Sequence, residues 1–294
     1  MTISLIIPTL NGAKELPALM KRLRNQTMPP DEIIVVDSAS TDGTAQLAGQ
    51  LGAKVIEIER KDFDHGGTRD KALRHSKGDF VLFMTQDALP VDEHYIERLI
   101  APFDDPRVAA VGGRQVPKKN ARLFEKLVRE HNYPAHTRVW DASAIDEMGV
   151  RAFLISDVCS AYRRMAYLNA GGFDHPIMTN EDMLMAQRLL EAGHAICYCG
   201  AAAVYHSHNM TLVQQYKRNY IVGRTMKRYE ARFAHVNEMG EGTKLAKAVL
   251  MQLLKEMHLI EAVCFCADCA ARLFGNRLGR MAEAKQNKTQ AAHD

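Results

Sequence analysis

The segment Phe83-Met84-Thr85-Gln86-Asp87-Ala88-Leu89-Pro90 marks the point where a strongly apolar run gives way to polar residues. Residues 79–85 are predicted to form a buried strand, and the Asp87 carboxylate follows directly after it. Two earlier apolar runs, residues 3–8 and 32–37, are also followed at once by polar residues. Strands that end in this way predict an open sheet whose ligands bind along one edge.

Helix-like segments separate these strands throughout the first half of the chain. Apolar residues recur at helical spacing between residues 16 and 23, helices are predicted at 44–51 and 68–76, and another strand is predicted at 54–59. Continuous apolar strands that alternate with helices predict a parallel sheet covered on both faces. The expected fold class is α/β, with a Rossmann-like, mostly parallel central sheet flanked by helices.

The second half of the chain is less regular. We predict strands at 107–113 and 195–205, helices at 123–130 and 181–192, an irregular substrate-facing insert at 134–155, and long helices at 212–233 and 243–274. The expected domains are residues 1–210, which contain the sheet, residues 211–281 as a C-terminal helical extension, and residues 282–294 as a mobile tail.

The composition is that of a soluble globular protein, with 47% apolar and 25% charged residues in 294 and a formal charge of +3. We predict no nucleic-acid partner.

The first residues are interpreted as a strand and not a signal peptide, so the protein is expected in the cytoplasm. Charged residues interrupt the apolar stretch 246–274, which makes a membrane span costly but leaves peripheral binding open. The cysteines at 264, 266 and 269 are interpreted as thiols, with a metal site as the alternative.

The segment Val35-Val36-Asp37-Ser38-Ala39-Ser40-Thr41-Asp42-Gly43-Thr44 joins a strand to the start of a helix. Asp37 could accept a hydrogen bond from a pyrimidine ring N–H, which would select against purines because they would leave the buried carboxylate unpaired. Helix capping is the alternative, and it accounts for Asp42 better than for Asp37.

A second candidate segment is His65-Gly66-Gly67-Thr68-Arg69, in which two glycines precede a helix. Gly66 and Gly67 would allow close approach of a ligand, the helix N-terminus favours negative charge, and Arg69 could grip a phosphate. The alternative is a flexible turn with a surface arginine.

Asp87 is the predicted metal ligand, because a carboxylate with phosphate oxygens can hold Mg²⁺ or Mn²⁺ and neutralise a departing diphosphate. An ordinary turn is the alternative.

Further along, Glu181 and Asp182 begin a helix, where a partly desolvated carboxylate could deprotonate an acceptor hydroxyl. His206 and His208 follow the last predicted strand, so an imidazole could return to the same edge as a metal ligand.

In their order along the chain, these motifs resemble the family 2 glycosyltransferases, which have the GT-A fold. The resemblance covers residues 1–210. The matching segments are the opening strand and nucleotide loop Ile7-Pro8-Thr9-Leu10-Asn11, the uridine or thymidine pocket Val36–Thr44 with Asp37 and Ser40, the metal-binding position Thr85-Gln86-Asp87-Ala88, and the pair Glu181-Asp182. The pattern departs from the full DXD motif at Thr85, which replaces the first acidic residue. His206 or His208 and waters could compensate for the missing metal ligand.

Three segments are similar to those of bacterial rhamnosyltransferases that use dTDP-L-rhamnose for cell-surface polysaccharide. They are Phe63-Asp64-His65-Gly66-Gly67-Thr68-Arg69, Thr85-Gln86-Asp87-Ala88 and Ser156-Asp157-Val158-Cys159-Ser160-Ala161. The resemblance implies an inverting transfer with Asp182 as base, and a donor site formed by Pro8, Thr9, Asn11, Asp37, Ser40, Gly66, Gly67, Arg69 and Gln86. A UDP-sugar is the alternative donor. The implied acceptor is a glycan or lipid-linked sugar, with peripheral binding to the inner membrane and a homodimer as further expectations.

Two other functions compete with this one. A nucleotidyltransferase would carry a glycine-rich basic loop after the first strand, and Pro8-Thr9-Leu10-Asn11-Gly12-Ala13 is not such a loop. A non-catalytic protein that binds nucleotide sugars or glycans would have lost the chemistry, which the presence of Asp37, Asp87 and Asp182 together disfavours.

Overall fold

The computed structural model describes residues 1–234, 236 and 241–290. Its contacts divide the chain into two compact units. The first unit comprises Met1–Val116, Tyr133–Ile177 and Glu181–His206, and the second comprises Pro117–Asn132, Met178–Asn180 and Ser207–Asp294. The predicted domain boundaries, 1–210, 211–281 and 282–294, stay a prediction.

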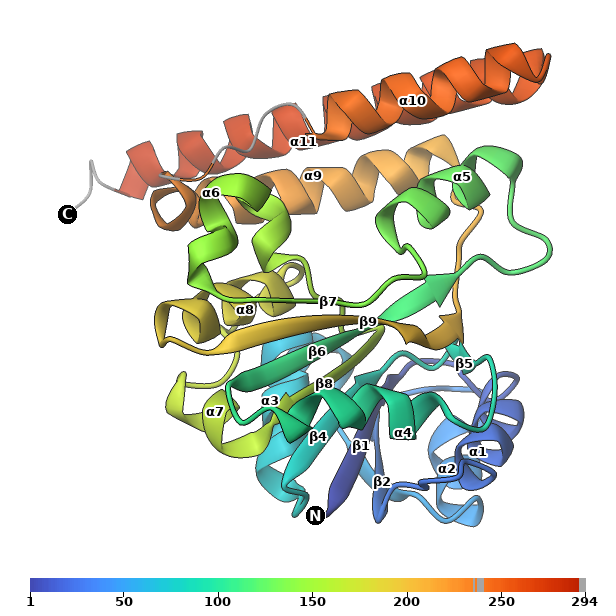
Figure 1. Cartoon of the computed structure of the whole chain (residues 1–294), viewed down its shortest axis with the longest axis vertical. Helices are drawn as coiled ribbons and strands as arrows, with labels where there is room; N and C mark the ends of the chain where they lie inside the picture. The colour runs from blue at the N-terminus through green and yellow to red at the C-terminus, as the bar shows by residue number, and fades with distance from the viewer. Residues whose placement is uncertain (235, 237–240, 291–294) are drawn as a thin grey trace. The chain divides into compact units, whose positions relative to one another are not determined.

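The first unit is built on one sheet with strand order β3-β2-β1-β4-β8-β6-β9-β5 (Figure 1). β1 (Ile3–Thr9), β2 (Glu32–Asp37), β3 (Lys54–Glu57) and β4 (Phe80–Met84) form its parallel half, as the sequence predicted. The middle residues of β1, β2 and β4 are fully buried because helices cover both faces. The α/β prediction is therefore confirmed.

Helices pack onto this sheet through the apolar faces that the sequence predicted. α1 (Leu16–Arg24) buries Leu16, Leu19, Met20 and Leu23, which belong to the same core as Leu5 and Val35 of the sheet. The other helices of this unit are α2 (Thr44–Gln50), α3 (His65–His75), α4 (Tyr95–Ile100), α6 (Ile145–Met148), α7 (Arg164–Asn169) and α8 (Glu181–Glu191). Figure 1 shows α3 and α4 on opposite faces of the sheet.

The other half of the sheet is mixed. β8 (Cys159–Arg163) lies antiparallel between β4 and β6 (Val108–Val116), and β9 (Ala195–Tyr205) runs parallel to β6. β5 (Leu89–Pro90) and β7 (Arg138–Trp140) both pair antiparallel with β9. The sequence analysis missed β8, because this five-residue strand passes directly into α7 with no turn residue to mark its end.

Short 3-10 turns complete the first unit. They are η1 (Arg60–Asp62), η2 (Ala101–Asp104), η3 (Ala142–Ala144) and η4 (Gly149–Phe153). The segment predicted as an irregular insert, residues 134–155, contains only β7, α6 and two of these turns, so its irregularity is confirmed. That it faces a substrate stays a prediction.

The second unit is helical. It contains α5 (Leu123–Asn132), α9 (Leu212–Arg228), η5 (Glu230–Phe233), α10 (Glu241–Lys255) and α11 (Leu259–Gln290). The helix predicted at 243–274 is broken at Met257, whose φ of 59° ends α10. Residues 282–290 of the predicted tail continue α11, and residues 291–294 lie outside the described residues. In the described part of the chain, no helix is both long and apolar enough to span a bilayer.

Glycines allow α9 and α11 to pack with their backbones almost in contact. A Cβ atom added at Gly223 of α9 would lie 2.1 Å from the carbonyl oxygen of Asn276, and one at Gly279 of α11 would lie 2.0 Å from that of Tyr220. Both obstacles are backbone atoms of a neighbouring helix, so a larger residue could be accommodated only by moving the helices apart.

We therefore expect Gly223→Ala to lower the free energy of unfolding by about 1–3 kcal/mol or more, because overpacking forces the two helices apart. Urea unfolding followed by far-UV circular dichroism measures this loss. Gly242→Ala in α10 is the matched control, because no atom lies within 4 Å of its added Cβ. That change should raise helix stability by about 0.5–1 kcal/mol. An unchanged midpoint for Gly223→Ala would contradict the tight crossing.

Candidate active site

The candidate residues of the first unit gather at one edge of the sheet, where the parallel strands end. Thr9 and Asp37 are paired in register at the ends of β1 and β2, and Asp87 follows the end of β4. Since β8 is antiparallel to β4 and pairs Cys159 with Met84, Asp157 lies at this same edge. His206 follows β9, which runs in the same direction as β4. The convergence predicted from the sequence is therefore present.

Asp37 is held in place by hydrogen bonds from the surrounding loop. Its carboxylate is buried and accepts from the Thr9 hydroxyl at 3.1 Å, the Ser40 backbone N–H at 2.8 Å and the Ser40 hydroxyl at 2.6 Å. A carboxylate has about four lone-pair sites, so one stays available for an incoming ring N–H. Thr9 and Ser40 thus fix the orientation of Asp37, and the contact of this carboxylate with a base stays a prediction.

The loops after β1, β2 and β4 are tied to one another by side-chain amides. Gln86 accepts from the Leu10 backbone N–H at 2.9 Å and donates to the Leu10 carbonyl at 3.1 Å. Asn11, with φ of 49°, accepts from the Thr41 backbone N–H at 2.9 Å, and its own N–H donates to the Ser40 hydroxyl at 2.8 Å. Gln86 and Asn11 thus shape the edge, and their direct contact with a donor stays a prediction, as does that of Pro8.

Asp87 and His206 lie side by side at the proposed metal position. His206 Nε2 is 3.4 Å from Asp87 Oδ2, and His206 Nδ1 is 2.9 Å from Gln115 Oε1. If Nδ1 carries the proton, Gln115 accepts from it and the Nε2 lone pair points toward Asp87, which is the tautomer that binds metal. A carboxylate and an imidazole together fit a divalent ion such as Mn²⁺. His208, the third member of this group of candidate ligands, is exposed and belongs to the second unit.

Arg69, predicted to grip a phosphate, is buried in a group of carboxylates. Only 4% of its side chain is exposed. Its Nη1 donates to Glu181 Oε1 at 3.0 Å, and its Nε lies 3.8 Å from Asp157 Oδ2. α3 thereby joins the start of α8 to the start of β8 through one cation. In this arrangement Arg69 neutralises acidic side chains, and its contact with a phosphate stays a prediction.

Asp182, the predicted base, lies against the same group. Its Oδ2 accepts from the Asp157 backbone N–H at 3.3 Å, and its Oδ1 accepts from the Met183 N–H at 2.8 Å. Burial raises the pKa of Asp182 well above its usual range, and the charges of Glu181 and Asp157 raise it further. Burial also raises the pKa of Glu181 to about 7. In its ionised form, a carboxylate with a raised pKa is a stronger base toward a hydroxyl than an ordinary aspartate.

Asp157 is a site residue to which the sequence analysis assigned no role. Its Oδ1 accepts from the Ser160 hydroxyl at 2.7 Å and the Tyr162 hydroxyl at 2.9 Å. Burial raises its pKa against the opposing effect of Arg69. The rings of Phe83, Tyr162, Tyr167 and Phe173 pack together, with adjacent centroids 5.0 to 6.4 Å apart, and they exclude water here. Ser160 and Tyr162 are two residues apart on β8, so their side chains lie on the same face of the strand. Had β8 been recognised, this spacing would have indicated that both hydroxyls can reach Asp157.

The two glycines predicted to approach a ligand have structural reasons to be small. A Cβ at Gly66 would lie 2.1 Å from the Asp174 carbonyl oxygen, and one at Gly67 would lie 2.5 Å from the Asp64 carboxylate. Asp64 caps α3 by accepting from the Gly67 N–H at 2.7 Å. The helix N-terminus thus already carries a carboxylate, and a direct role of Gly66 and Gly67 in donor binding stays a prediction.

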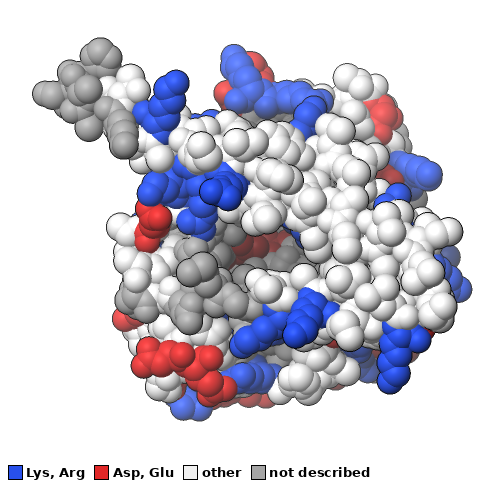
Figure 2. All heavy atoms as spheres, turned by 90° about the horizontal axis from the view of Figure 1, so that it is seen from above, with Lys and Arg blue, Asp and Glu red and all other residues white. Residues whose placement is uncertain are grey.

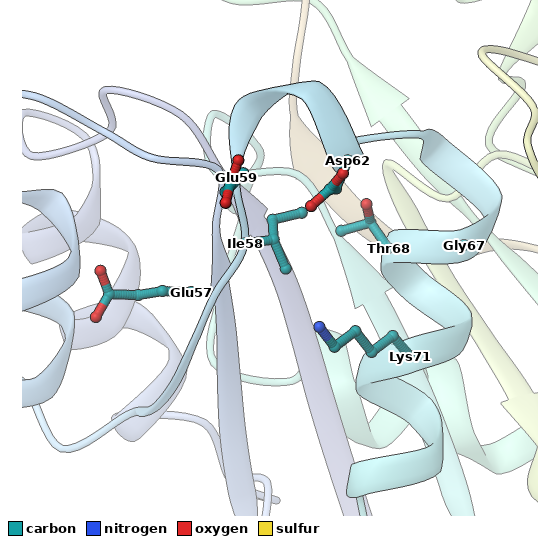
Figure 3. A pocket seen from close by; sticks show the side chains of 7 residues that line it. All are labelled: Glu57, Ile58, Glu59, Asp62, Gly67, Thr68 and Lys71. Carbon is teal, nitrogen blue, oxygen red and sulfur yellow. The ribbon is translucent and has the colours of Figure 1, made fainter.

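A hollow of about 330 Å³ lies beside the strand end that carries Asp37 (Figure 3). Thr68 and Lys71 of α3 face Ile58 and Asp62 across it, while Glu57 points away. The Ile58 N–H donates to the Asp37 carbonyl at 2.9 Å, so the hollow is directly coupled to β2. The sequence analysis did not predict it. Its lining is of mixed charge, with the carboxylates of Glu59 and Asp62 and the ammonium of Lys71.

Comparison with known proteins identifies relatives of this chain. The model of the family described as "Glycosyl transferase family 2" matches residues 4–169. The chain is 38% identical over 225 residues to the O-antigen chain rhamnosyltransferase RfbN of Salmonella typhimurium, an alignment that covers 76% of this chain and 72% of RfbN. It is 37% identical over 222 residues to the O-antigen chain rhamnosyltransferase WbaN of Salmonella anatum, covering 75% and 70% of the two chains.

Solved structures show the same fold at lower identity. A mannosyltransferase from Pyrobaculum calidifontis, in complex with GDP-Man and Mn²⁺, aligns with a TM-score of 0.60 and 20% identity over 99% of this chain and 79% of its own. Residues 1–349 of TarS from S. aureus align with a TM-score of 0.57 and 17% identity over 97% and 92% of the two chains. Since the family model matches more than half of the chain and two relatives align over three quarters of it, the chain belongs to glycosyl transferase family 2.

Proposed function

We propose that this family 2 glycosyltransferase transfers L-rhamnose from dTDP-L-rhamnose to a hydroxyl of a cell-surface glycan, with inversion at the anomeric carbon. The observation that carries the proposal is the position of Asp182, whose carboxylate accepts from the Asp157 backbone N–H at the edge of the sheet, because a transferase that makes one displacement needs one base. The raised pKa of Asp182 supports the same role. The relatives RfbN and WbaN, both rhamnosyltransferases, support L-rhamnose as the sugar. A UDP-sugar is the alternative donor, since one aspartate reads the edge that uracil and thymine share.

The chain's own residues would act in three places. Asp37, oriented by Thr9 and Ser40, would accept from the ring N–H of the donor base. Asp182 would take the acceptor proton as the hydroxyl oxygen attacks the anomeric carbon opposite the departing diphosphate. The positive charge of Arg69 would offset the negative charges of Glu181 and Asp157. Asp182 would then be the carboxyl of this group that exchanges a proton.

Asp87, His206 and His208 are the proposed ligands of a divalent cation, Mg²⁺ or Mn²⁺. When bound, such an ion neutralises the charge that develops on a diphosphate leaving group. The orientation of His206 by Gln115 supports this proposal, as does the Mn²⁺ in the complex of the Pyrobaculum calidifontis mannosyltransferase.

The acceptor is proposed to be a growing polysaccharide or a sugar on a lipid carrier, reached from the cytoplasm at the inner face of the membrane. RfbN and WbaN, both O-antigen chain enzymes, support this class of acceptor. Peripheral membrane binding and a homodimer are further parts of the proposal. A non-catalytic nucleotide-sugar binder is the competing function, and it would release no nucleoside diphosphate from donor and acceptor.

We expect Asp182→Asn to lower the rate of transfer by about 10²- to 10⁴-fold, because the amide keeps the shape of the side chain but cannot accept the proton. Release of dTDP from dTDP-L-rhamnose with a cell-envelope acceptor measures the rate, and calorimetry measures donor binding, which should be little changed. Asp104→Asn, at an exposed position of η2, is the control. Unchanged turnover in Asp182→Asn would reject Asp182 as the base.

The pH profile tests the role of Asp157. Since the base must be ionised and its pKa is raised, kcat/KM should fall as the pH drops through that raised value. Asp157→Asn removes a charge that raises the pKa of Asp182, so the acidic limb should move to lower pH. A merely structural role for Asp157 would lower the rate at every pH and leave the position of the limb unchanged.

Removal of the metal tests the proposed cation site. We expect EDTA to suppress transfer and added Mn²⁺ or Mg²⁺ to restore it, whereas full activity in excess EDTA would count against Asp87 as a ligand. Calorimetric titration with Mn²⁺ alone should show binding weakened about 10- to 100-fold in Gln115→Ala, because His206 loses its orienting partner. His94→Ala, at an exposed position beside Glu97, should bind Mn²⁺ like the unmodified protein.

A further inference from the structure

Large apolar side chains that are exposed to solvent concentrate in the second unit. Of the eighteen such side chains in the described part of the chain, fourteen belong to this unit. Single exposed apolar residues are ordinary on protein surfaces, but a group of this size within one helical unit marks a surface that binds something.

Most of these residues lie on α10, on α11 and at the corner between the two helices. Ile260, Val263, Phe274, Leu278 and Met281 are between 43% and 82% exposed. Their spacing of three, four and eleven residues puts them on one face of α11 at 3.6 residues per turn. Ala267 and Ala270 fall on the same face between them. The result is one apolar stripe about 32 Å long, at 1.5 Å per residue.

The opposite face of α11 is already in use inside the unit. Phe265 and Gly279 are buried there, and so are the carboxylates of Asp268 and Glu283. Asp268 pairs with Arg272 at 2.6 Å, and Glu283 pairs with Arg224 and Arg228 of α9 at 2.7 and 2.8 Å. These acidic groups therefore do not face outward with the apolar stripe.

The corner between α10 and α11 places apolar side chains outward at a cost in stability. Met257 has φ of 59°, a conformation that non-glycine residues rarely adopt, and its side chain is 74% exposed. Glycine would end the helix with less strain. Met251 and Leu254 of α10, 58% and 42% exposed, continue the apolar surface.

The charge of the two units differs in sign. The second unit has 19 Lys and Arg residues against 10 Asp and Glu, whereas the first has 19 against 25. On α10, Lys244, Lys247 and Lys255 are exposed at the same helical spacing as Met251 and Leu254. Figure 2 shows a broad area without charged side chains, bordered by groups of Lys and Arg.

We propose that the exposed apolar surface of α10 and α11, from Met251 to Met281, docks in the plane of an anionic lipid bilayer. Its apolar residues would enter the headgroup boundary while the flanking lysines and Arg277 meet acidic headgroups. No described helix is apolar enough to cross the bilayer, which fits a helix pair that lies on it. A second copy of the chain is a less favourable occupant, because it would bring two strongly basic units together.

This surface would provide the peripheral membrane binding that is part of the proposed function, and the inference rests on that part. Vesicle flotation of the full chain without donor, acceptor or metal tests the surface separately from the proposed transfer reaction. The protein should float with phosphatidylglycerol–phosphatidylethanolamine vesicles and not with phosphatidylcholine vesicles. Lys247→Gln with Lys255→Gln should weaken binding about 25-fold, or about fivefold for each lysine. Ile260→Gln with Phe274→Gln should weaken it about tenfold or more.

The matched control carries Val139→Gln and Met165→Gln, which remove two exposed apolar side chains of the first unit and should leave flotation unchanged. Circular dichroism of each variant shows that it is folded. The proposal is overturned if the unmodified protein does not float with anionic vesicles, or if Ile260→Gln with Phe274→Gln floats equally well. A dimer in sedimentation velocity that this variant dissociates, without flotation, would assign the surface to a second copy.

Discussion

The candidate active site depends on one buried cation shared among carboxylates that come from distant parts of the sequence. Arg69 on α3 bonds Glu181 at the start of α8 and lies beside Asp157 at the start of β8. Breaking a buried ion pair by removing one partner costs about 3–5 kcal/mol, because the remaining charge is left in an apolar setting. The positions of α3, α8 and β8 at the sheet edge are therefore coupled through this guanidinium.

The raised pKa of Asp182 follows from the same arrangement. One guanidinium cannot compensate three nearby carboxylates, and the aromatic rings behind Asp157 exclude water that would otherwise stabilise the charges. Desolvation and like charge both favour the protonated form of a carboxyl. Burial and the charges of Glu181 and Asp157 thus raise the pKa of Asp182, so the residues around this carboxyl set its basicity.

The sequence was sufficient for the parallel half of the fold and for the grouping of Asp37 and Asp87 at one edge of the sheet. Long apolar runs with helices between them identify β1, β2 and β4, and the residues just after them converge because parallel strands end at one edge. The sequence was not sufficient for β8 or for the surroundings of Arg69. A five-residue strand leaves too little periodicity, and the ion pair between Arg69 and Glu181 spans 112 positions. Local patterns carry no information about such a contact.

The same limit explains why motif matching and geometry give different accounts of Arg69 and Gln86. A motif associates both with the donor, yet the structure shows each of them making bonds within the protein: Arg69 to Glu181, and Gln86 to the backbone of Leu10. A residue that orients others affects the reaction as strongly as one that touches the substrate, because a small displacement of a reacting group costs a large part of the rate. The fixed positions of Asp37, Asp87 and Asp182 are therefore as much a property of these supporting bonds as of the carboxylates themselves.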